Sequence, residues 1–296
     1  MPAGRILLYT ASIAAFALVV RSIAMGPLPM FVSALALGAY VAIILCGVFF
    51  LRLGMFVDVV VRGPEGARGV ALTFDDGPSP RSTPEILDLL DDAKAKATFF
   101  VIGRKAEQHP DLVREILSRG HAVALHSYAH HRLFSLKSAR YVRDDLQKAI
   151  AVLTEITGDK PVLFRPPIGH TNATIARVVK ELGLEVIGWS VRALDGVAAA
   201  DPRRVAARVT RGLEDGAIVL MHDASERDDR TPASVAALPA ILAAMAARNL
   251  DGVRVDDWLV DEEERTSSPR EAKRSEGGAV KRPAAKRAAA AHDEQA

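Results

Sequence analysis

Short apolar runs alternate with longer amphipathic stretches from residue 70 to about residue 250. A short apolar run bounded by glycine or proline is typical of a buried strand, and a longer stretch with apolar residues at helical spacing is typical of a helix. Strands are therefore predicted near 70–74, 97–102, 122–125, 162–165, 186–190 and 217–221. Helices are predicted over 84–94, 105–119, 138–157, 172–182, 202–214 and 232–248. This alternation predicts an α/β fold with parallel strands.

The N-terminal region has a different pattern, with two long apolar runs and few charges. Residues 6–20 are apolar between Arg5 and Arg21, and residues 30–51 form a longer apolar run. A helix needs about 20 apolar residues to cross a bilayer, so the second run predicts a membrane span. The first run is shorter, and a second span, an interfacial helix and part of an uncleaved signal all remain open for it.

Beyond residue 260 the chain has almost no large apolar side chains. Its serine, proline, alanine and charged residues cannot bury enough apolar surface to form a core, so this tail is predicted to be disordered. Its basic part, 265–287, is expected to be solvated rather than bound to anionic lipid. The predicted organisation is a membrane region with one or two hydrophobic helices over 1–62, a folded domain over 63–260 and a disordered charged tail over 261–296.

Composition narrows the classes of function. The 296 residues carry a formal net charge of +2, which argues against a dedicated nucleic-acid surface. The one cysteine, Cys46, lies in an apolar run. A disulfide framework and a thiolate metal site are therefore excluded.

Two adjacent acids, Asp75 and Asp76, follow the strand predicted at 70–74, and Gly77 and Pro78 turn the chain directly after them. Because neighbouring strand residues point in opposite directions, the two carboxylates are expected to diverge. One acid can then bind a cation while the other stays free to move a proton.

Two histidines, His126 and His130, follow the strand predicted at 122–125. Side chains four residues apart share one face of a helical turn. Two imidazoles and one carboxylate would supply three metal ligands and leave positions open for water and substrate. An isolated pair of this spacing more often consists of ordinary surface histidines than of metal ligands. Together with Asp76, the metal-site interpretation is favoured. His131 is the second choice of ligand.

Two further polar side chains come at strand ends. Arg165 ends the strand 162–165, where its guanidinium can hold a carboxylate with two hydrogen bonds. His222 ends the apolar run 217–221, and a carboxylate such as Asp195 nearby would raise its pKa, so that it could act as a general acid. The ordinary alternatives are a surface arginine in a turn and a core histidine.

The remaining histidines carry weaker signals. His109 and His121 stand beside proline and glycine and are expected to cap helices or lie at the surface. His170 follows Gly169 near the predicted site, so a contact with substrate is an alternative for it.

The polar residues lie in the segments TFDDGP (73–78), HSYAH (126–130), RPPIG (165–169) and LMHD (220–223), in this order. With these segments the chain resembles the polysaccharide deacetylases with a NodB homology domain, which form carbohydrate esterase family four. The resemblance covers about residues 69–260. It implies a distorted (β/α) barrel, preceded here by the hydrophobic membrane segment, with the site at the C-terminal ends of the strands.

The resemblance also implies the metal site. Asp76, His126 and His130 would bind one divalent metal ion, most often zinc, with cobalt or manganese as alternatives. Asp75 would act as the catalytic base, and Arg165 would orient it.

The same resemblance assigns the acid and the substrate contacts. His222, tuned by Asp195, would protonate the departing amine. Leu220 would line a small pocket for the acyl methyl group. The turn that contains Pro167 and Gly169 would contact the substrate, and a backbone amide there or in the turn 77–79 would stabilise the oxyanion.

The implied activity is that of a metal-dependent hydrolase of linear amides. A metal-bound water would attack the acyl carbonyl and remove N-linked or O-linked acetyl groups from a carbohydrate polymer. The alternatives are a deacylase or deformylase of a lipid-linked aminosugar, and a catalytically inactive glycan-binding module. The expected partners are an N-acetylated glycan or lipid-linked sugar and membrane lipid, and no oligomeric state is predicted.

Two segments depart from the family pattern. The family's fourth segment is commonly D-x-x-D-W, whereas this chain has Arg192 at the first acid and Gly196 in place of the tryptophan. An aromatic residue often precedes the glycine of the third segment, and here it is Ile168. Both departures affect expected substrate contacts and neither affects the metal ligands.

The location follows from two opposing signals. Arg52, Arg62 and Arg68 follow the second apolar run, and basic residues tend to remain cytoplasmic. A cell-wall or exported glycan requires the opposite face. On substrate grounds the predicted location is the inner (cytoplasmic) membrane of a bacterium, with the catalytic domain on the outer face.

Overall fold

The fold is built on one curled sheet of parallel strands. The computed structural model describes residues 1–197 and 199–259, so the predicted tail over 261–296 lies outside the described residues. Within them, eight strands pair in the order β1-β6-β5-β4-β3-β2-β8-β7, and every pairing is parallel. Their bounds are Val59–Val60 for β1, Ala71–Asp75 for β2, Ala97–Val101 for β3, Ala122–Leu125 for β4, Leu163–Phe164 for β5, Glu185–Ile187 for β6, Val191–Arg192 for β7 and Ile218–His222 for β8.

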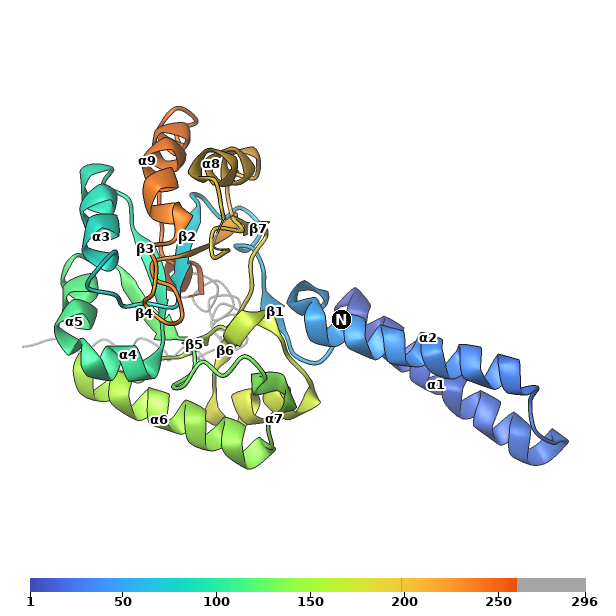
Figure 1. Cartoon of the computed structure of the whole chain (residues 1–296). Coiled ribbons are helices and arrows are strands. Elements are labelled where there is room, and N and C mark those ends of the chain that lie inside the picture. The colour runs from blue at the N-terminus through green and yellow to red at the C-terminus, as the bar shows by residue number, and fades with distance from the viewer. Residues whose placement is uncertain (198, 260–296) are drawn as a thin grey trace, which may run out of the picture. The chain divides into compact units, whose positions relative to one another are not determined.

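Helices surround the sheet on its outer side (Figure 1). They are α3 (Thr83–Asp92), α4 (Gly103–Gln108), α5 (Pro110–Ser118), α6 (Ala139–Thr157), α7 (Ala173–Leu182), α8 (Pro202–Arg211) and α9 (Ala233–Ala246). The predicted alternation of parallel strands with helices is confirmed.

The ends of the best-predicted helices are set by capping residues. The Ser138 hydroxyl accepts a hydrogen bond from the Tyr141 N–H at the start of α6, and the Asn172 side chain accepts one from the Ile175 N–H at the start of α7. Gly158 and Gly183 end these helices in the left-handed conformation. Because capping depends on adjacent residues, the sequence predicts these boundaries closely.

Alternate residues of the central strands face opposite ways. Leu72 and Phe74 of β2 join the apolar core, together with Val219 and Met221 of β8. The residues between them face the inside of the curled sheet, where the parallel register sets Thr73 beside Leu220 and Asp75 beside His222. This alternation directs polar side chains into the interior of the sheet, above a shell of apolar packing.

The segment after β6 draws the two edges of the sheet together. The Gly188 N–H donates to the Val60 carbonyl of β1 at 2.8 Å, and the Ser190 N–H donates to the Ile218 carbonyl of β8 at 3.0 Å. A Cβ atom on Gly188 would lie 2.9 Å from a methyl carbon of Val59, so the close approach to β1 requires glycine. The sheet therefore curls into an incomplete barrel.

Two predicted elements differ from those observed. The helix predicted over 105–119 is divided into α4 and α5 at His109, which precedes Pro110 and has φ −132° and ψ 56°. Proline disfavours the helical conformation in the residue before it, which explains the break. The strand predicted at 186–190 ends at Ile187. In addition, β1 belongs to the sheet although it lies before the predicted domain boundary at residue 63.

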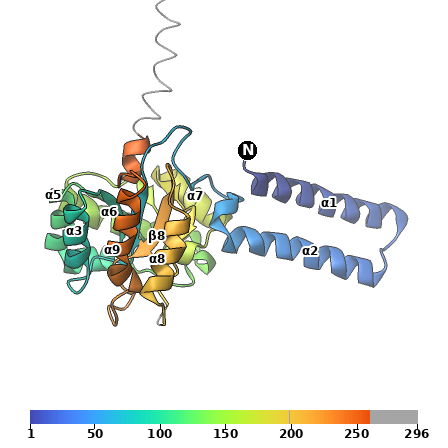
Figure 2. The same ribbon diagram turned by 90° about the horizontal axis from the view of Figure 1, so that it is seen from above.

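An antiparallel pair of long helices precedes the sheet, α1 (Ala3–Met25) and α2 (Met30–Phe49) (Figure 1, Figure 2). At about 1.5 Å per residue each is long enough for a hydrocarbon core of about 30 Å. Of the most apolar 18 residues of each helix, 0% are buried in α1 and 6% in α2. Neither helix is therefore a core helix of the domain. By length and composition, both could cross a membrane.

Candidate active site

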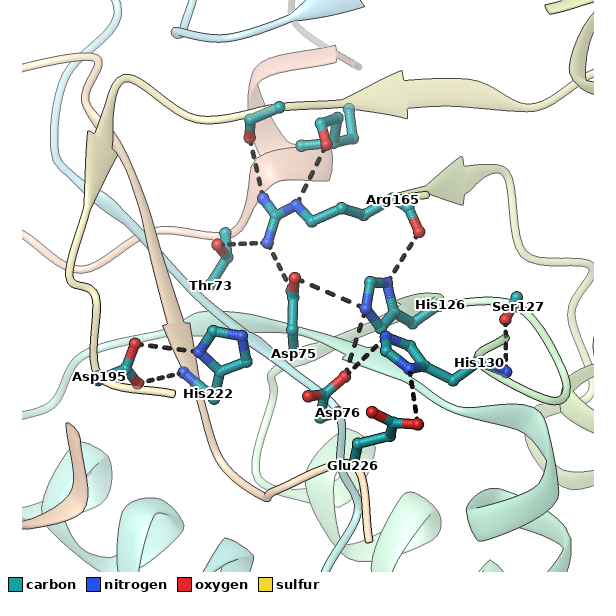
Figure 3. Close-up of polar contacts among 12 residues, drawn as sticks. Thr73, Asp75, Asp76, His126, Ser127, His130, Arg165, Asp195, His222 and Glu226 are labelled. Carbon is teal, nitrogen blue, oxygen red and sulfur yellow. Dashed lines mark hydrogen bonds and ion pairs between the residues drawn. The ribbon is translucent and has the colours of Figure 1, made fainter. Parts of the chain in front are cut away.

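The predicted site residues meet at the C-terminal edge of the sheet (Figure 3). Asp75 ends β2, and Asp76 follows it. His126 follows β4, Arg165 follows β5, and His222 ends β8. Because the strands are parallel, their C-terminal ends come to the same edge, where barrel folds gather their chemistry.

Asp76, His126 and His130 form a compact cluster. Asp76 Oδ1 lies 3.4 Å from His126 Nε2 and 3.2 Å from His130 Nε2, and one ligand atom from each residue lies within 4.8 Å of the others. Ligands about 2.0–2.1 Å from one zinc ion in a tetrahedron lie about 3.3 Å from each other. The spacing therefore fits one divalent cation.

The environment of Asp76 also fits a cation. Its Oδ1 is buried and has no hydrogen-bond partner among the described residues. Burial alone would raise the pKa of this carboxyl group, but the imidazoles of His126, His130 and His222 outweigh burial and lower it. The carboxylate is thus held in the charged form that binds metal.

The two histidines meet through a loop and not through the predicted helical turn. Ser127 and His130 have φ angles of 63° and 49°, in the left-handed region. The Ser127 hydroxyl accepts a hydrogen bond from the His130 N–H at 3.0 Å. The Asp145 carboxylate of α6 accepts from the N–H groups of Tyr128 and Ala129, at 2.8 and 3.0 Å. These contacts of the loop bring the two imidazoles together. The prediction from their four-residue spacing had assumed a helical turn instead.

The protonation of His126 follows from its backbone contact. Its Nδ1 lies 2.8 Å from the Arg165 carbonyl oxygen, which can only accept a hydrogen bond. Nδ1 therefore carries the proton, and the Nε2 lone pair faces Asp76 and the cluster.

Arg165 crosses the interior of the barrel and binds Asp75. Its Nη1 donates to Asp75 Oδ1 at 2.6 Å and to Thr73 Oγ1 at 2.8 Å. Its Nε and Nη2 donate to the carbonyls of Ile187 and Gly188, and the whole side chain is buried. Four hydrogen bonds fix the guanidinium, so Asp75 is held in one orientation.

The two adjacent acids do not diverge as expected from strand alternation. Asp76 has φ 74°, so it lies beyond the regular strand. Asp75 Oδ2 lies 3.9 Å from His126 Nε2, the same atom that Asp76 approaches. Both carboxylates face the cluster, and their partners differ because Arg165 holds only Asp75.

His222 and Asp195 lie on the other side of Asp75 (Figure 3). Asp195 Oδ1 lies 3.0 Å from His222 Nδ1, and Oδ2 accepts the His222 backbone N–H at 2.8 Å. Burial alone would lower the pKa of His222, but Asp195 and, less strongly, Asp76 and Asp75 outweigh burial and raise it to about 10. The imidazole is therefore protonated at neutral pH and can donate a proton.

The expected substrate contacts border this site. Leu220 lies two residues before His222 on the same strand and is buried. Pro167 and Gly169 are buried in the short helix η3 (Pro167–Gly169), where a Cβ on Gly169 would lie 2.5 Å from Trp189. The Ser79 and Gly169 amides already donate within the chain, to Thr83 Oγ1 and the Pro166 carbonyl. Pro78 and Pro167 have no N–H to donate. The Gly77 and Ile168 amides are therefore the remaining candidates for stabilising the oxyanion.

The departures from the family pattern lie at the mouth of the site. A Cβ on Gly196 would lie 3.3 Å from His222 Cε1, so the glycine leaves that face of the imidazole uncovered. The Arg192 guanidinium lies 5.9 Å from the centre of the Trp189 ring. Ile168 is 44% exposed and has φ 53°, which is a strained conformation for a β-branched residue.

Other histidines lie outside the cluster. His131, the second choice of ligand, accepts the Leu133 N–H at its Nδ1. His121 is buried, contrary to its expected surface position, and its Nδ1 accepts the Ala97 N–H. Burial lowers the pKa of His121 to about 4, so it is a neutral core residue.

Two acids near the site were given no role from the sequence: Glu226, which belongs to none of the four segments, and Asp223, which ends the segment LMHD. Glu226 Oε1 lies 3.9 Å from His130 Nδ1, which is buried and has no hydrogen-bond partner among the described residues. Glu226 Oε2 binds Arg132 at 2.7 Å, and its backbone carbonyl accepts from Arg104. Asp223 is buried against Gly77 and accepts from the Thr83 hydroxyl at 2.6 Å.

Comparison with known proteins identifies the family. A family model described as polysaccharide deacetylase matches residues 62–187. A peptidoglycan-N-acetylglucosamine deacetylase of Bacillus cereus is 34% identical over 204 residues, which cover 66% of this chain and 90% of that protein. The chain belongs to the polysaccharide deacetylase family.

Other members of the polysaccharide deacetylase family differ in length and activity. A peptidoglycan-N-acetylglucosamine deacetylase of Listeria monocytogenes is 37% identical over 188 residues, but the chain spans only 38% of its length. A pseudoenzyme of carbohydrate esterase family four from Bacillus anthracis has a TM-score of 0.61 and 26% identity, covering 70% of this chain and 71% of that one. The expected barrel of this family is thereby confirmed.

Proposed function

We propose that this chain is a metal-dependent deacetylase that removes N-linked acetyl groups from a carbohydrate polymer; O-linked acetyl groups are a second substrate of the same chemistry. The observation that carries the proposal is the cluster of Asp76, His126 and His130 beside a separate carboxylate that Arg165 holds. One set of groups suits cation binding, and the other suits proton transfer. The relatives named peptidoglycan-N-acetylglucosamine deacetylase support the substrate class.

Asp76 Oδ1 and the Nε2 atoms of His126 and His130 would hold the cation. Two imidazoles and a carboxylate suit zinc, with cobalt or manganese as alternatives. A divalent cation at this place would polarise the acyl carbonyl and make a water molecule more acidic.

Asp75 is proposed as the base. Arg165 occupies its Oδ1, and its Oδ2 faces the cluster, where it can take a proton from an attacking water. The arginine fixes the carboxylate orientation, so the proton acceptor is in place before the substrate arrives.

His222 is proposed as the acid. An amide nitrogen leaves only when it is protonated, and the imidazole held by Asp195 carries a proton that it can donate. Leu220 would border the acyl methyl group, and the turn that contains Pro167 and Gly169 would support the sugar.

An inactive glycan-binding module is the competing function, because a pseudoenzyme shares the fold. Fold alone therefore cannot support activity. The intact groups for metal binding, base and acid support catalysis in this chain.

The proposed location is the inner membrane of a bacterium, with α1 and α2 as a hairpin of two spans and the catalytic domain on the outer face. Arg5, in the first turn of α1, pairs with Asp58, which follows α2, at 2.9 Å. Two spans return the chain to its starting side, so the N-terminus and the domain should share one face. Protease added to intact spheroplasts should cleave both; protection of both would place the domain inside.

Chelation and two substitutions test the activity. Chelator-treated protein should lose hydrolysis of acetylated glucosamine oligomers and regain it with zinc or cobalt. Asp75→Asn should retain the metal and lose about 10²–10⁴-fold in kcat, whereas His126→Ala should lose the metal, as measured by atomic absorption. Activity that is indifferent to chelation, or normal turnover by Asp75→Asn, would contradict the proposal.

A further inference from the structure

The C-terminal end of α2 contacts the loop that follows Arg165. The Val48 carbonyl accepts a hydrogen bond from the Thr171 N–H at 3.2 Å. The Phe49 ring meets the His170 ring edge to face, with 4.8 Å between their centres. The end of a candidate membrane span is therefore in contact with the loop that continues from Arg165.

The same end of the hairpin packs closely on the next segment of the chain. A Cβ atom on Gly47 would lie 2.2 Å from Met55 Sδ, and one on Gly4 would lie 2.4 Å from the Leu53 carbonyl oxygen. These glycines allow backbone and side chains to approach more closely than any other residue would. Together with the ion pair of Arg5 and Asp58, this packing attaches both ends of the hairpin to the segment before β1.

The cation cluster is near this contact. The Arg165 carbonyl binds the His126 imidazole, and His170 is five residues further along the chain. Five residues span at most about 18 Å when fully extended, and the short helix η3 shortens that path. Arg165, whose carbonyl holds a cluster histidine, is therefore within about 18 Å of the residue that Phe49 contacts.

Exposed apolar side chains lie on the segments that meet at this contact. They are Phe50 at 56%, Leu133 at 56%, Leu136 at 75% and Ile168 at 44% exposure. The segment η2 (Phe134–Leu136) is joined to the loop by a hydrogen bond from Asn172 to the Ser135 carbonyl. An apolar rim that continues from the end of an apolar hairpin is suited to a lipid surface.

We propose that this rim, Phe50, Leu133, Leu136 and Ile168, rests on the bilayer surface, and that the substrate is a membrane-tethered aminosugar glycan. The inference rests on the proposed deacetylase function and narrows its substrate class. A glycan joined to a lipid in the same bilayer would reach the cation cluster directly. A soluble oligomer would gain nothing from the rim.

Two tryptophans allow the position of the rim to be measured. Trp189 contacts Gly169 beside the hairpin contact, whereas Trp258 is buried at the other end of the strands, where its Nε1–H donates to the Arg68 carbonyl. Trp258→Phe leaves Trp189 as the fluorophore, and Trp189→Phe leaves Trp258. In vesicles of brominated lipid, Trp189 should be quenched clearly more than Trp258. Equal quenching, or none for Trp189, would overturn the proposal.

A charge on the rim tests the substrate class. Leu136→Asp should lower turnover of a lipid-linked acetylglucosamine oligomer in vesicles several-fold and leave turnover of the free oligomer unchanged. Val162→Asp is the matched control, because Val162 is 51% exposed and directly precedes β5, at the opposite end of that strand from Arg165. It should leave both rates unchanged.

The outcomes separate the two proposals. Failure of the full chain to deacetylate either oligomer would contradict the deacetylase function itself. Deacetylation of the free oligomer as fast as the lipid-linked one, with Leu136→Asp indistinguishable from Val162→Asp, would overturn only the membrane-tethered substrate.

Discussion

Asp75 and Asp76 are neighbours in the chain but have different partners, and the difference arises from one backbone angle. Asp75 is the last residue of β2 and meets Arg165, whereas the positive φ of Asp76 turns its carboxylate to the two imidazoles. At the scale of single residues, the role of each polar side chain in the site is determined by the hydrogen bonds and ion pairs that it already makes. Two residues allow this idea to be tested: Glu226, which lies outside the expected set, and Asp195, which belongs to it.

Glu226 is expected to orient His130. Its Oε1 lies 3.9 Å from His130 Nδ1, which is beyond hydrogen-bond distance, and we expect metal binding to draw the two together. A carboxylate that accepts the Nδ1 proton directs the Nε2 lone pair at the metal, and loss of such a partner typically costs about 10–100-fold in metal affinity. Glu226→Gln should therefore bind zinc about 10-fold or more weakly in a competition titration with a chromophoric chelator. Glu181→Gln, which removes a surface partner of Arg143, should bind zinc normally. Equal affinities would refute the role of Glu226.

Asp195 is expected to set the alkaline limb of the pH profile. His222 must be protonated to act as an acid, and Asp195 raises its pKa, so activity should persist to high pH and fall as that proton is lost. Asp195→Asn removes the main raising charge, so the pKa of His222 should fall and the alkaline limb of kcat/KM should move to lower pH. An alkaline limb that stays in place would show that another group titrates there.

At the scale of elements, turns place the strand ends in contact. The turn after β2 is packed against the residue that follows β8, since Asp223 Oδ2 would lie only 2.0 Å from a Cβ on Gly77. The Asp223 backbone carbonyl also accepts the Ser82 hydroxyl at 2.5 Å, which joins the start of α3 to the same place. These contacts hold the metal-binding turn and the end of β8 in one unit.

Gly77→Ala should disturb this unit. The new methyl group must displace the buried Asp223 carboxylate, and overpacking of this kind typically costs about 1–3 kcal/mol. The free energy of unfolding of the domain should fall by that amount in denaturant titrations. Gly38→Ala is the control, because no atom outside its own stretch of helix backbone lies within 4 Å of its Cβ position and alanine is favoured inside a helix. A stable Gly77→Ala domain would mean that Asp223 moves freely.

At the scale of the whole molecule, a cation at the cluster would join β2 to the loop after β4. Metal that binds only the folded state stabilises it by about 2.7 kcal/mol at 100 times its Kd. For a domain of this size the Tm should rise by about 5–10 °C on addition of zinc to chelator-treated protein. His126→Ala should show no such rise in differential scanning fluorimetry. A zinc-dependent shift of equal size in that variant would place the stabilising metal elsewhere.

The local elements were largely predictable from the sequence, and their contacts were less so. Ser138 and Asn172 cap helices where the pattern predicts them, because a cap depends on residues a few positions away. The break at His109 was missed although Pro110 signals it. The approach of His126 to His130 was predicted from a helical turn, but left-handed residues and the Asp145 carboxylate bring it about.

By itself, the sequence determined six of the eight described strands, most of the helices between them, the two apolar runs and the polar residues at the ends of β2, β4, β5 and β8, because these depend on near neighbours and on burial. Only the tertiary structure decided that Glu226 faces His130, that Gly77 packs on Asp223, and that the end of α2 meets His170. Such contacts join residues far apart in the chain. They depend on strand order and on the curl of the sheet, which no local pattern specifies.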